Sequence, residues 1–204
     1  MSIEEIVQSW KRSRDISPCI TDLRIFEKRE GQYLPFPNSV HPVIKEAFQK
    51  EGIERLYSHQ ADAIEAVQNG KDVVVVTPTA SGKTLCYNLP VLNLKLSAPS
   101  SKAFYLFPTK ALSQDQMVEL QGLIEKLEKP ITTYTYDGDT PQDARQAIRA
   151  KGDIVITNPD MLHTGILPHH TKWVSFFENL KFVVIDELHT YRGVFGSHMT
   201  NVLR

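Results

Sequence analysis

The sequence predicts an α/β fold in which helices cover both faces of a parallel β-sheet, preceded by a small helical and extended appendage. Short apolar stretches, each long enough for one strand, alternate along the chain with helical patterns. Parallel strands that are buried on both faces form continuous apolar runs, and they need helical crossovers. A polar cluster also follows each apolar stretch, at the strand end where open α/β sheets gather their ligands.

Residues 1–40 are predicted to be an extension of the main domain. A helical period runs from Ile3 to Arg12, an extended piece follows, and prolines punctuate the stretch YLPFPNSVHP. The main domain is expected at residues 41–204 and begins with a helix from Pro42 to Gln49. Because a helical pattern is still running where the sequence stops, we expect this domain to be truncated there.

The main domain alternates helices and strands. Ser58 is expected to cap a helix that ends at Asn69 and Gly70. Strands are then expected in DVVVV, KAFYLF, ITTYTY, DIVIT and KFVVI, which are residues 72–76, 102–107, 131–136, 153–157 and 181–185. Helices are expected after Lys83 and at residues 110–127, 141–150 and 160–167. We expect Asp160 to cap the last of these helices.

Composition excludes some classes of protein. The chain of 204 residues is 41% hydrophobic, yet it shows neither a signal-peptide pattern at its start nor an apolar run long enough to span a bilayer. Its two cysteines make neither a disulfide framework nor a zinc cluster. We therefore expect a soluble cytoplasmic protein with no membrane partner. The balance of 23 basic and 24 acidic residues decides nothing about nucleic acids.

The loop TPTASGKT, residues 77–84, has the features of a phosphate-binding loop. Gly82 permits a close backbone approach, Lys83 can reach the β- and γ-phosphates, and Thr84 can offer its hydroxyl to magnesium. The following helix aims the positive end of its dipole at the anion. Thr77 stands where the general pattern has glycine, which distinguishes this loop from those of kinases and GTPases. The alternative is an ordinary connection in which Lys83 is solvated.

A second polar cluster, DELH, begins at Asp186 after the last apolar stretch. Hydrolysis of a phosphate anhydride needs a carboxylate that holds magnesium and a group that activates water. We assign the first role to Asp186 and the second to Glu187. An acidic pair often serves only the N-terminus of a helix, so this assignment depends on the phosphate loop.

Together the two clusters resemble motif I and the DExH box of superfamily 2 helicases, whose first domain is a RecA-like P-loop NTPase. This resemblance implies ATP and Mg²⁺ as cofactors. It implies catalytic roles for Lys83, Asp186, Glu187 and His189, with Thr84 and Asp186 on the metal. Gln60 matches the glutamine that recognises adenine in that family. The residues assigned to nucleotide binding are Gln60, Thr79, Ala80, Ser81, Gly82, Lys83, Thr84 and Leu85.

Three further clusters match the family in order. LFPTKALSQDQ resembles motif Ia, YDGDT stands where such proteins often carry a glycine turn, and TNPDMLH resembles motif Ib. Contacts to a nucleic-acid backbone are expected from Pro108, Thr109, Lys110, Gly138, Thr157 and Pro159. A tight Asp-Gly turn without a ligand is the alternative for YDGDT. Tyr191, Arg192 and Phe195 either contact DNA or another domain or pack a helix.

The stretch ENLKFVVIDELHTYRGVFGSH, with ILPHHTKWVSFFENL before it, is similar to YprA/MrfA-type bacterial helicases, relatives of a RecQ-like fungal helicase. The likeness covers about residues 37–204. It implies an ATP-dependent helicase that moves 3′ to 5′ on single-stranded DNA, acts in repair and is monomeric. It also implies a second RecA-like domain as partner and a zinc-binding C-terminal region, both beyond this sequence. We expect the segment itself to bind ATP weakly and to hydrolyse almost none.

Other functions stay open at this point. One is an RNA helicase or remodeller that uses the same motor. Another is a nucleotide-dependent scaffold that does not translocate, although a scaffold has no need of paired acids. A small-molecule kinase with a phosphate loop would require a lid and an acceptor site in place of the clusters that resemble motifs Ia and Ib.

Overall fold

A computed structural model describes the protein at residues 2–26, 30–78 and 81–204. The chain forms two compact units, of which the first extends to Gln32 and the second runs from Tyr33 to Arg204. Each unit is described by itself.

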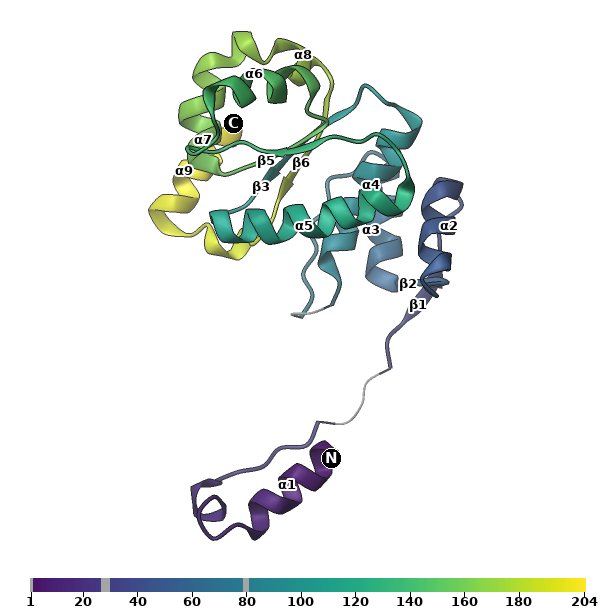
Figure 1. Ribbon diagram of the computed structural model, residues 1–204, viewed down its shortest axis with the longest axis vertical. Coiled ribbons are helices and arrows are strands. Elements are labelled where there is room, and N and C mark those ends of the chain that lie inside the picture. The colour runs from purple at the N-terminus through teal and green to yellow at the C-terminus, as the bar shows by residue number, and fades with distance from the viewer. Residues whose placement is uncertain (1, 27–29, 79–80) are drawn as a thin grey trace. The chain divides into compact units, whose positions relative to one another are not determined.

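The first unit contains helix α1 (Ile3–Arg12) and a short 3₁₀ helix, η1 (Ser17–Cys19) (Figure 1). Ser2 and Glu5 cap α1 reciprocally. The Ser2 hydroxyl accepts from the Glu5 N–H at 3.2 Å, and the Glu5 carboxylate accepts from the Ser2 N–H at 2.8 Å. The helix predicted over these residues is confirmed, and none of its side chains is buried.

The second unit opens with an antiparallel pair of strands and two helices, namely β1 (Tyr33–Pro35), α2 (Pro42–Lys50), β2 (Arg55–Tyr57) and α3 (Ser58–Gln68). The helix predicted from Pro42 is confirmed, and Gly52 follows its end with a left-handed φ of 78°. The prediction that Ser58 caps α3 is wrong. Ser58 is the first helical residue, and the Gln60 side chain reaches back to accept from the Tyr57 N–H at 3.0 Å.

Four parallel strands form the main sheet, in the spatial order β4 (Thr133–Thr135), β5 (Ile154–Thr157), β3 (Lys102–Leu106) and β6 (Leu180–Ile185). Each lies within a predicted stretch, except that β6 begins one residue earlier, at Leu180, so the parallel α/β sheet is confirmed (Figure 1). Leu106 pairs with Thr157 of β5 and with Ile185 of β6. The segments that follow these three strands therefore leave the sheet at the same edge.

Helices cover both faces of this sheet. The remaining helical elements are α4 (Lys83–Ser97), α5 (Lys110–Leu127), α6 (Gln142–Lys151), α7 (Pro159–Met161), η2 (Leu162–Ile166), η3 (Leu167–Lys172), α8 (Val174–Glu178), η4 (Leu188–Thr190) and α9 (Gly193–Leu203). Alternate residues of β3 point to opposite faces. Ala103 and Tyr105 pack with α2 to α5, whereas Phe104 and Leu106 pack with α6, η2, α8 and α9.

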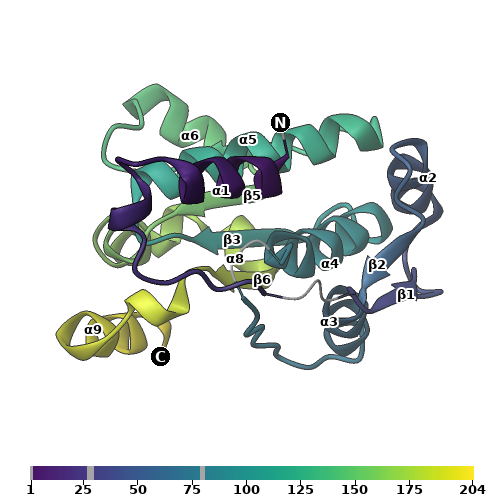
Figure 2. The same cartoon turned by 90° about the horizontal axis from the view of Figure 1, so that it is seen from below.

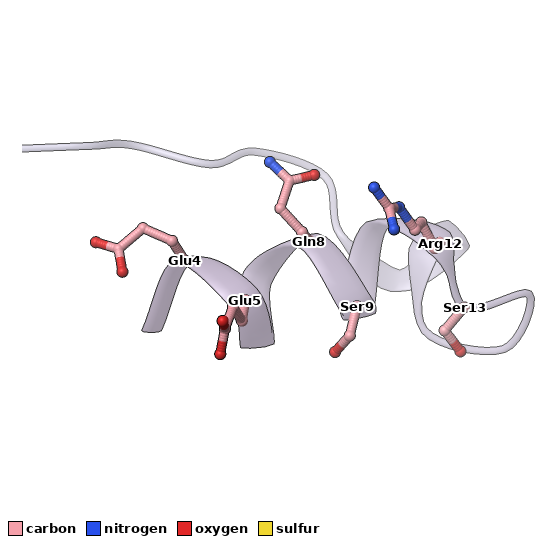
Figure 3. Close-up of a pocket in the computed structure, with 6 residues that line it drawn as sticks. All are labelled: Glu4, Glu5, Gln8, Ser9, Arg12 and Ser13. Atoms are coloured by element: carbon pink, nitrogen blue, oxygen red, sulfur yellow. The ribbon is translucent and has the colours of Figure 1, made fainter. Parts of the chain in front are cut away.

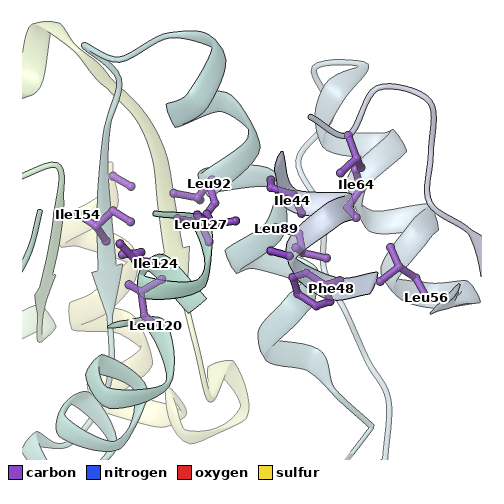
Figure 4. Close-up of a cluster of buried hydrophobic side chains, with 14 of the residues drawn as sticks. Ile44, Phe48, Leu56, Ile64, Leu89, Leu92, Leu120, Ile124, Leu127 and Ile154 are labelled. Atoms are coloured by element: carbon purple, nitrogen blue, oxygen red, sulfur yellow. The ribbon is translucent and has the colours of Figure 1, made fainter. Parts of the chain in front are cut away.

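The first of these layers is shown in Figure 4, where Leu120, Ile124 and Leu127 of α5 lie beside Ile154 of β5. Helix α3 lies beside α4 (Figure 2). On the other face, Trp173 and Phe176 are each 1% exposed and pack in the core layer that contains Phe104 of β3.

The segment Val73–Val76 is not a strand, so this prediction is wrong. Val74 and Val76 are 73% and 88% exposed, and no backbone hydrogen bond of the valines is found among the described residues. A run of β-branched residues forms a strand only where a neighbouring strand can pair with it. Of the described strands, β6 pairs with β3 on one edge and has no partner on the other. The sheet therefore does not extend to these valines.

Candidate nucleotide and nucleic-acid site

Gly82 and Lys83 form the junction between the loop TPTASGKT and α4. Gly82 precedes the helix with a φ of 73°, a left-handed conformation that side chains disfavour. A Cβ at this position would lie 2.6 Å from Nε2 of Gln60. Lys83 donates from Nζ to the carbonyl oxygen of Thr77 at 3.0 Å, which keeps its ammonium group over the loop. A close backbone and a cation at a helix N-terminus are what a phosphate site needs.

The N-terminus of α3 holds this loop through two backbone carbonyls. Gln60, which is 3% exposed, donates from Nε2 to the carbonyl oxygen of Gly82 at 2.9 Å. Nε2 of His59 lies 2.9 Å from the carbonyl oxygen of Ser81. Because Oε1 of Gln60 accepts from Tyr57, both ends of its carboxamide are engaged within the chain. Adenine recognition by Gln60 stays a prediction. His59 was not predicted, although it is the neighbour of Gln60.

The other predicted loop residues differ in their surroundings. The Ser81 hydroxyl lies 2.6 Å from the Thr77 hydroxyl, so the threonine at the glycine position of the general pattern helps to close the loop. Leu85, in the first turn of α4, packs partly buried against the core. Thr79 and Ala80 lie outside the described residues.

Asp186 and Glu187 follow β6 directly and have different neighbours. The Asp186 N–H continues the ladder to the carbonyl oxygen of Leu106 at 3.1 Å, and Oδ1 of Asp186 accepts from the Glu187 N–H at 2.8 Å. Glu187 has a φ of 51°, a strained conformation for a residue other than glycine, which makes a tight turn after the strand. Its Oε2 lies 3.3 Å from Nε2 of His189. Two acids with separate neighbours can divide two chemical roles.

Asp186, one of the two predicted metal ligands, contacts Tyr87 of α4, which lies about one helical turn after Thr84, the other. The phenol oxygen of Tyr87 lies 3.2 Å from Oδ2 of Asp186 and 2.8 Å from Oε1 of Gln116 on α5. Burial and the charge of Asp186 raise the pKa of Tyr87, so the phenol is protonated. Because Mg²⁺ prefers oxygen ligands, a hydroxyl and a carboxylate gathered at one sheet edge fit a magnesium site.

The sequence did not mark Tyr87 or Gln116 as part of this site. A tyrosine one turn after Thr84 has the pattern of a helix core residue, and a glutamine in α5 has the pattern of an exposed one. Their roles depend on how α4, α5 and the end of β6 pack together, which no local pattern encodes.

Two predicted nucleic-acid contacts begin α5. Thr109 caps the helix, its hydroxyl accepting from a backbone N–H of the first turn at 3.3 Å. The side chain of Lys110 is 51% exposed and forms an ion pair with Asp139. The hydrogen bond from Lys110 to the Asp139 carboxylate raises the pKa of Lys110. Gly138, next to Asp139, is exposed, and Pro108 is half-buried. The structure thus brings the start of α5 and the YDGDT turn together.

The YDGDT segment is built as a tight turn. Oδ1 of Asp137 accepts from the Asp139 N–H at 2.9 Å. Arg145 donates to the carbonyl oxygens of Thr140 at 2.9 Å and Asp137 at 3.1 Å. These bonds agree with the simpler interpretation of the segment, and a nucleic-acid contact at Gly138 stays a prediction.

Thr157 and Pro159 are buried, and the nucleic-acid contacts expected from them stay predictions. Thr157 is 1% exposed and donates to the carbonyl oxygen of Tyr136 at 2.6 Å, so its hydroxyl is already used. Pro159 is buried in the first turn of α7. The prediction that Asp160 caps this helix is wrong, because Asn158 does so by accepting from a backbone N–H at 2.7 Å. Asp160 is exposed in the first turn.

Tyr191 packs within the chain. It lies against the core layer of α6, α8 and α9, and its ring centroid is 5.1 Å from that of Phe195. Its buried hydroxyl has no hydrogen-bond partner in the described part of the chain. Burial, together with the charges of Asp186 and Asp160, raises the pKa of Tyr191 to about 12. Arg192 is exposed.

A separate hollow of about 650 Å³ runs along α1 in the first unit. Figure 3 shows the side chains that line it, which are Glu4, Glu5, Gln8, Ser9, Arg12 and Ser13. They all come from one helix and its end, and none is buried, so we assign no ligand to this hollow.

In the ranges that the structure describes, no helix combines the length and the apolar character needed to cross a bilayer.

Residues 57–204 match the model of the DEAD/DEAH box helicase family. The phosphate loop, the acidic pair and the parallel sheet described above lie within this match. The chain belongs to the DEAD/DEAH box helicase family.

The resemblance to YprA/MrfA-type helicases is confirmed as well. The chain is 54% identical over 203 residues to the uncharacterized ATP-dependent helicase YprA of Bacillus subtilis, and 47% identical over 205 residues to the ATP-dependent helicase HRQ1 of Saccharomyces cerevisiae. Both alignments cover 100% of this chain but only 27% and 19% of the relatives. A crystal structure of the DUF1998 helicase MrfA bound to DNA and AMPPNP matches with a TM-score of 0.91 at 54% identity, over 100% of this chain and 28% of that one.

Proposed function

We propose that the chain is the first motor domain of a longer ATP-dependent DNA helicase, and that it binds ATP with Mg²⁺ at the sheet edge. The observation that carries this proposal is the contact of Asp186 with Tyr87, which lies about one turn after Thr84 on α4. It brings the phosphate loop and the acidic pair to one place, as hydrolysis of a nucleoside triphosphate requires. The MrfA structure with AMPPNP supports the same choice of ligand.

Each residue of the site has a defined task in this proposal. Lys83 exchanges its bond to the Thr77 carbonyl for the β- and γ-phosphates. Thr84 and Asp186 hold the metal, which supplies positive charge where negative charge develops on the phosphates. Glu187 orients or deprotonates the attacking water, and His189 beside it links the nucleotide site to the nucleic acid.

Single-stranded DNA is the proposed polymer substrate. The exposed start of α5, with Thr109 and Lys110, supplies a hydroxyl and a cation suited to a phosphate backbone. MrfA has been crystallised with DNA. From the family likeness we also infer that the full-length protein moves from 3′ to 5′, acts in repair, is a cytoplasmic monomer and has a zinc-binding region elsewhere.

ATP hydrolysis by the full-length protein tests this proposal. We expect single-stranded DNA to stimulate it more than RNA does, whereas RNA preference would favour an RNA helicase. Nucleotide binding without turnover would favour a scaffold. Residues 1–204 alone should hydrolyse almost no ATP, because arginines worth about 10³–10⁵ in rate are expected in a second RecA-like domain. Steady turnover by residues 1–204, stimulated by DNA, would contradict the proposal.

A further inference from the structure

Tyr87 occupies a fixed position between three elements of the second unit. It lies on α4, its phenol oxygen contacts Gln116 of α5 at 2.8 Å, and the same oxygen contacts Asp186 after β6 at 3.2 Å. Its ring packs edge-on against Tyr105 of β3, with the ring centroids 5.4 Å apart and the planes at 88°. Because Tyr105 is 1% exposed within the sheet, the core sets the place of the Tyr87 hydroxyl.

The Tyr87 hydroxyl has one proton, yet both of these neighbours are acceptors. Asp186 presents a carboxylate oxygen. Gln116 presents its amide oxygen, which lies 2.8 Å from the phenol oxygen. The phenol therefore donates to Gln116 or to Asp186, but not to both at once.

We propose that Tyr87 is a positioning residue that couples the nucleotide site to α5 by directing this single proton to one acceptor or the other. The inference rests on the proposed function, because it takes Asp186 as a metal ligand. A cation bound to Asp186 would occupy lone pairs of the carboxylate and offset the negative charge that attracts the phenol proton. Tyr87 would then donate to Gln116, and this hydrogen bond would join α4 to α5. When Asp186 is free of metal, its charge attracts the proton and the tie to α5 weakens.

Helix α5 is a suitable carrier for this coupling. It begins at Lys110, directly after Thr109, and these are the residues proposed to contact the nucleic-acid backbone. Gln116 lies about two turns further along the same helix. A change in how Gln116 is held therefore acts on the helix whose first turn faces the proposed DNA.

The test compares the affinity of the full-length protein for single-stranded DNA with and without AMPPNP and Mg²⁺. In the wild type, nucleotide should change the DNA dissociation constant by about fivefold or more, as coupled sites do. Tyr87→Phe keeps the ring but removes the proton, and Gln116→Met keeps the volume but removes the acceptor. In both variants the ratio of the DNA dissociation constants measured without and with nucleotide should be about one. The double variant should show no further change, since the two residues form one connection.

Tyr105→Phe is the matched control, because it removes a buried phenol that bonds Asn88 at 2.9 Å and not the site. It should keep the wild-type ratio. A wild-type ratio in Tyr87→Phe would overturn the inference, and so would loss of the ratio in the control at an unchanged melting temperature. A wild type that binds nucleotide without any change in DNA affinity would also overturn it, whereas a wild type that binds no nucleotide contradicts the proposed function on which it rests.

Discussion

Among single residues, the two acids after β6 differ in what they contact. Asp186 bonds backbone and Tyr87, whereas Glu187 sits in a left-handed turn with His189 as its neighbour. The contacts of Asp186 suit a metal ligand, because they hold its carboxylate in place. Those of Glu187 suit a group that acts on a substrate, because the Glu187 side chain is 37% exposed and free of backbone bonds among the described residues.

Replacing Glu187 by glutamine should separate binding from hydrolysis. Glutamine keeps the size of the side chain but cannot take a proton, so ATP hydrolysis by the full-length protein should fall by about 10²–10⁴, with nucleotide affinity retained. Steady-state hydrolysis and equilibrium binding of an ATP analogue measure the two effects. Glu54→Gln, at an exposed position, is the control and should change neither. Normal turnover by Glu187→Gln would exclude it as the group that acts on water.

The sequence predicted the site residues whose roles depend on local spacing. Lys83 and Thr84 belong to a contiguous loop, and Asp186 and Glu187 follow an apolar stretch, so their chemistry is visible in the pattern. Tyr87 was missed because its role arises from the packing of distant segments. The burial of Thr157 was missed for a similar reason, since only the neighbouring strand end shows that its hydroxyl has a partner.

At the level of elements, the phosphate loop depends on α3 as much as on its own residues. The carboxamide of Gln60 and the imidazole of His59 hold the carbonyls of Gly82 and Ser81. This arrangement requires a glycine at the start of α4, because the backbone is left-handed there and Gln60 fills the space that a Cβ would take.

Gly82→Ala should therefore damage the loop. The left-handed conformation costs about 1–2 kcal/mol for a residue with a Cβ, and Nε2 of Gln60 would have to leave its bond to the Gly82 carbonyl. We expect a lower melting temperature and weaker nucleotide binding, measured by thermal unfolding and analogue titration. Gly122→Ala is the control. It lies inside α5 with nothing within 4 Å of the added Cβ, so it should stabilise the helix by up to about 1 kcal/mol. An unaffected Gly82→Ala protein would contradict the loop geometry.

Four of the predicted strands were found and one was not, and pairing explains the difference. The stretches that became β3, β4, β5 and β6 each have a neighbouring strand in the sheet. Val73–Val76 has an equally strong β pattern but no partner in the described residues, so propensity alone does not make it a strand. Caps were also hard to predict. Asn158 and Asp160 are similar candidates two residues apart, and at α3 the Gln60 side chain, not a serine hydroxyl, bonds the backbone that precedes the helix.

Across the second unit, a charged cluster ties together the sheet end opposite the phosphate loop. Asp153, just before β5, accepts hydrogen bonds from Lys95 of α4 at 2.7 Å and from Lys102 of β3 at 3.0 Å. It also accepts from the Thr132 N–H at 2.9 Å. Lys95 and Asp153 are only 7% and 12% exposed. Burial alone would raise the pKa of Asp153, but these hydrogen bonds outweigh it and lower the pKa.

Asp153 should therefore make stability depend on acidity. Because the pKa of Asp153 is lowered in the folded state, its contribution to the free energy of unfolding is complete above the ordinary aspartate pKa of about 3.9. This contribution is lost as the pH falls through the lower pKa of the folded state. Asp153→Asn should lower the free energy of unfolding at pH 7 by about 3–5 kcal/mol, and the difference from wild type should shrink below about pH 4. Urea unfolding at both pH values measures this.

Glu51→Gln is the control for Asp153→Asn. Glu51 pairs with Lys126, and both side chains are more than 40% exposed, at 43% and 42%. Such surface pairs contribute about 0–1 kcal/mol, so this substitution should change the free energy of unfolding little at either pH. Equal effects of the two substitutions at pH 7 would show that the Asp153 cluster does not stabilise the fold.

For the molecule as a whole, we propose above all that this domain binds ATP through the loop at the start of α4. The measurement is the equilibrium dissociation constant of a fluorescent ATP analogue in the presence of Mg²⁺, for the wild type and for Lys83→Ala. Equal melting temperatures of the two proteins show that the variant is folded. We predict that the wild type binds and that Lys83→Ala binds at least about tenfold more weakly, since a bond from a cation to phosphate is lost. Equal affinity of the two proteins, or no binding by the wild type, would contradict the account.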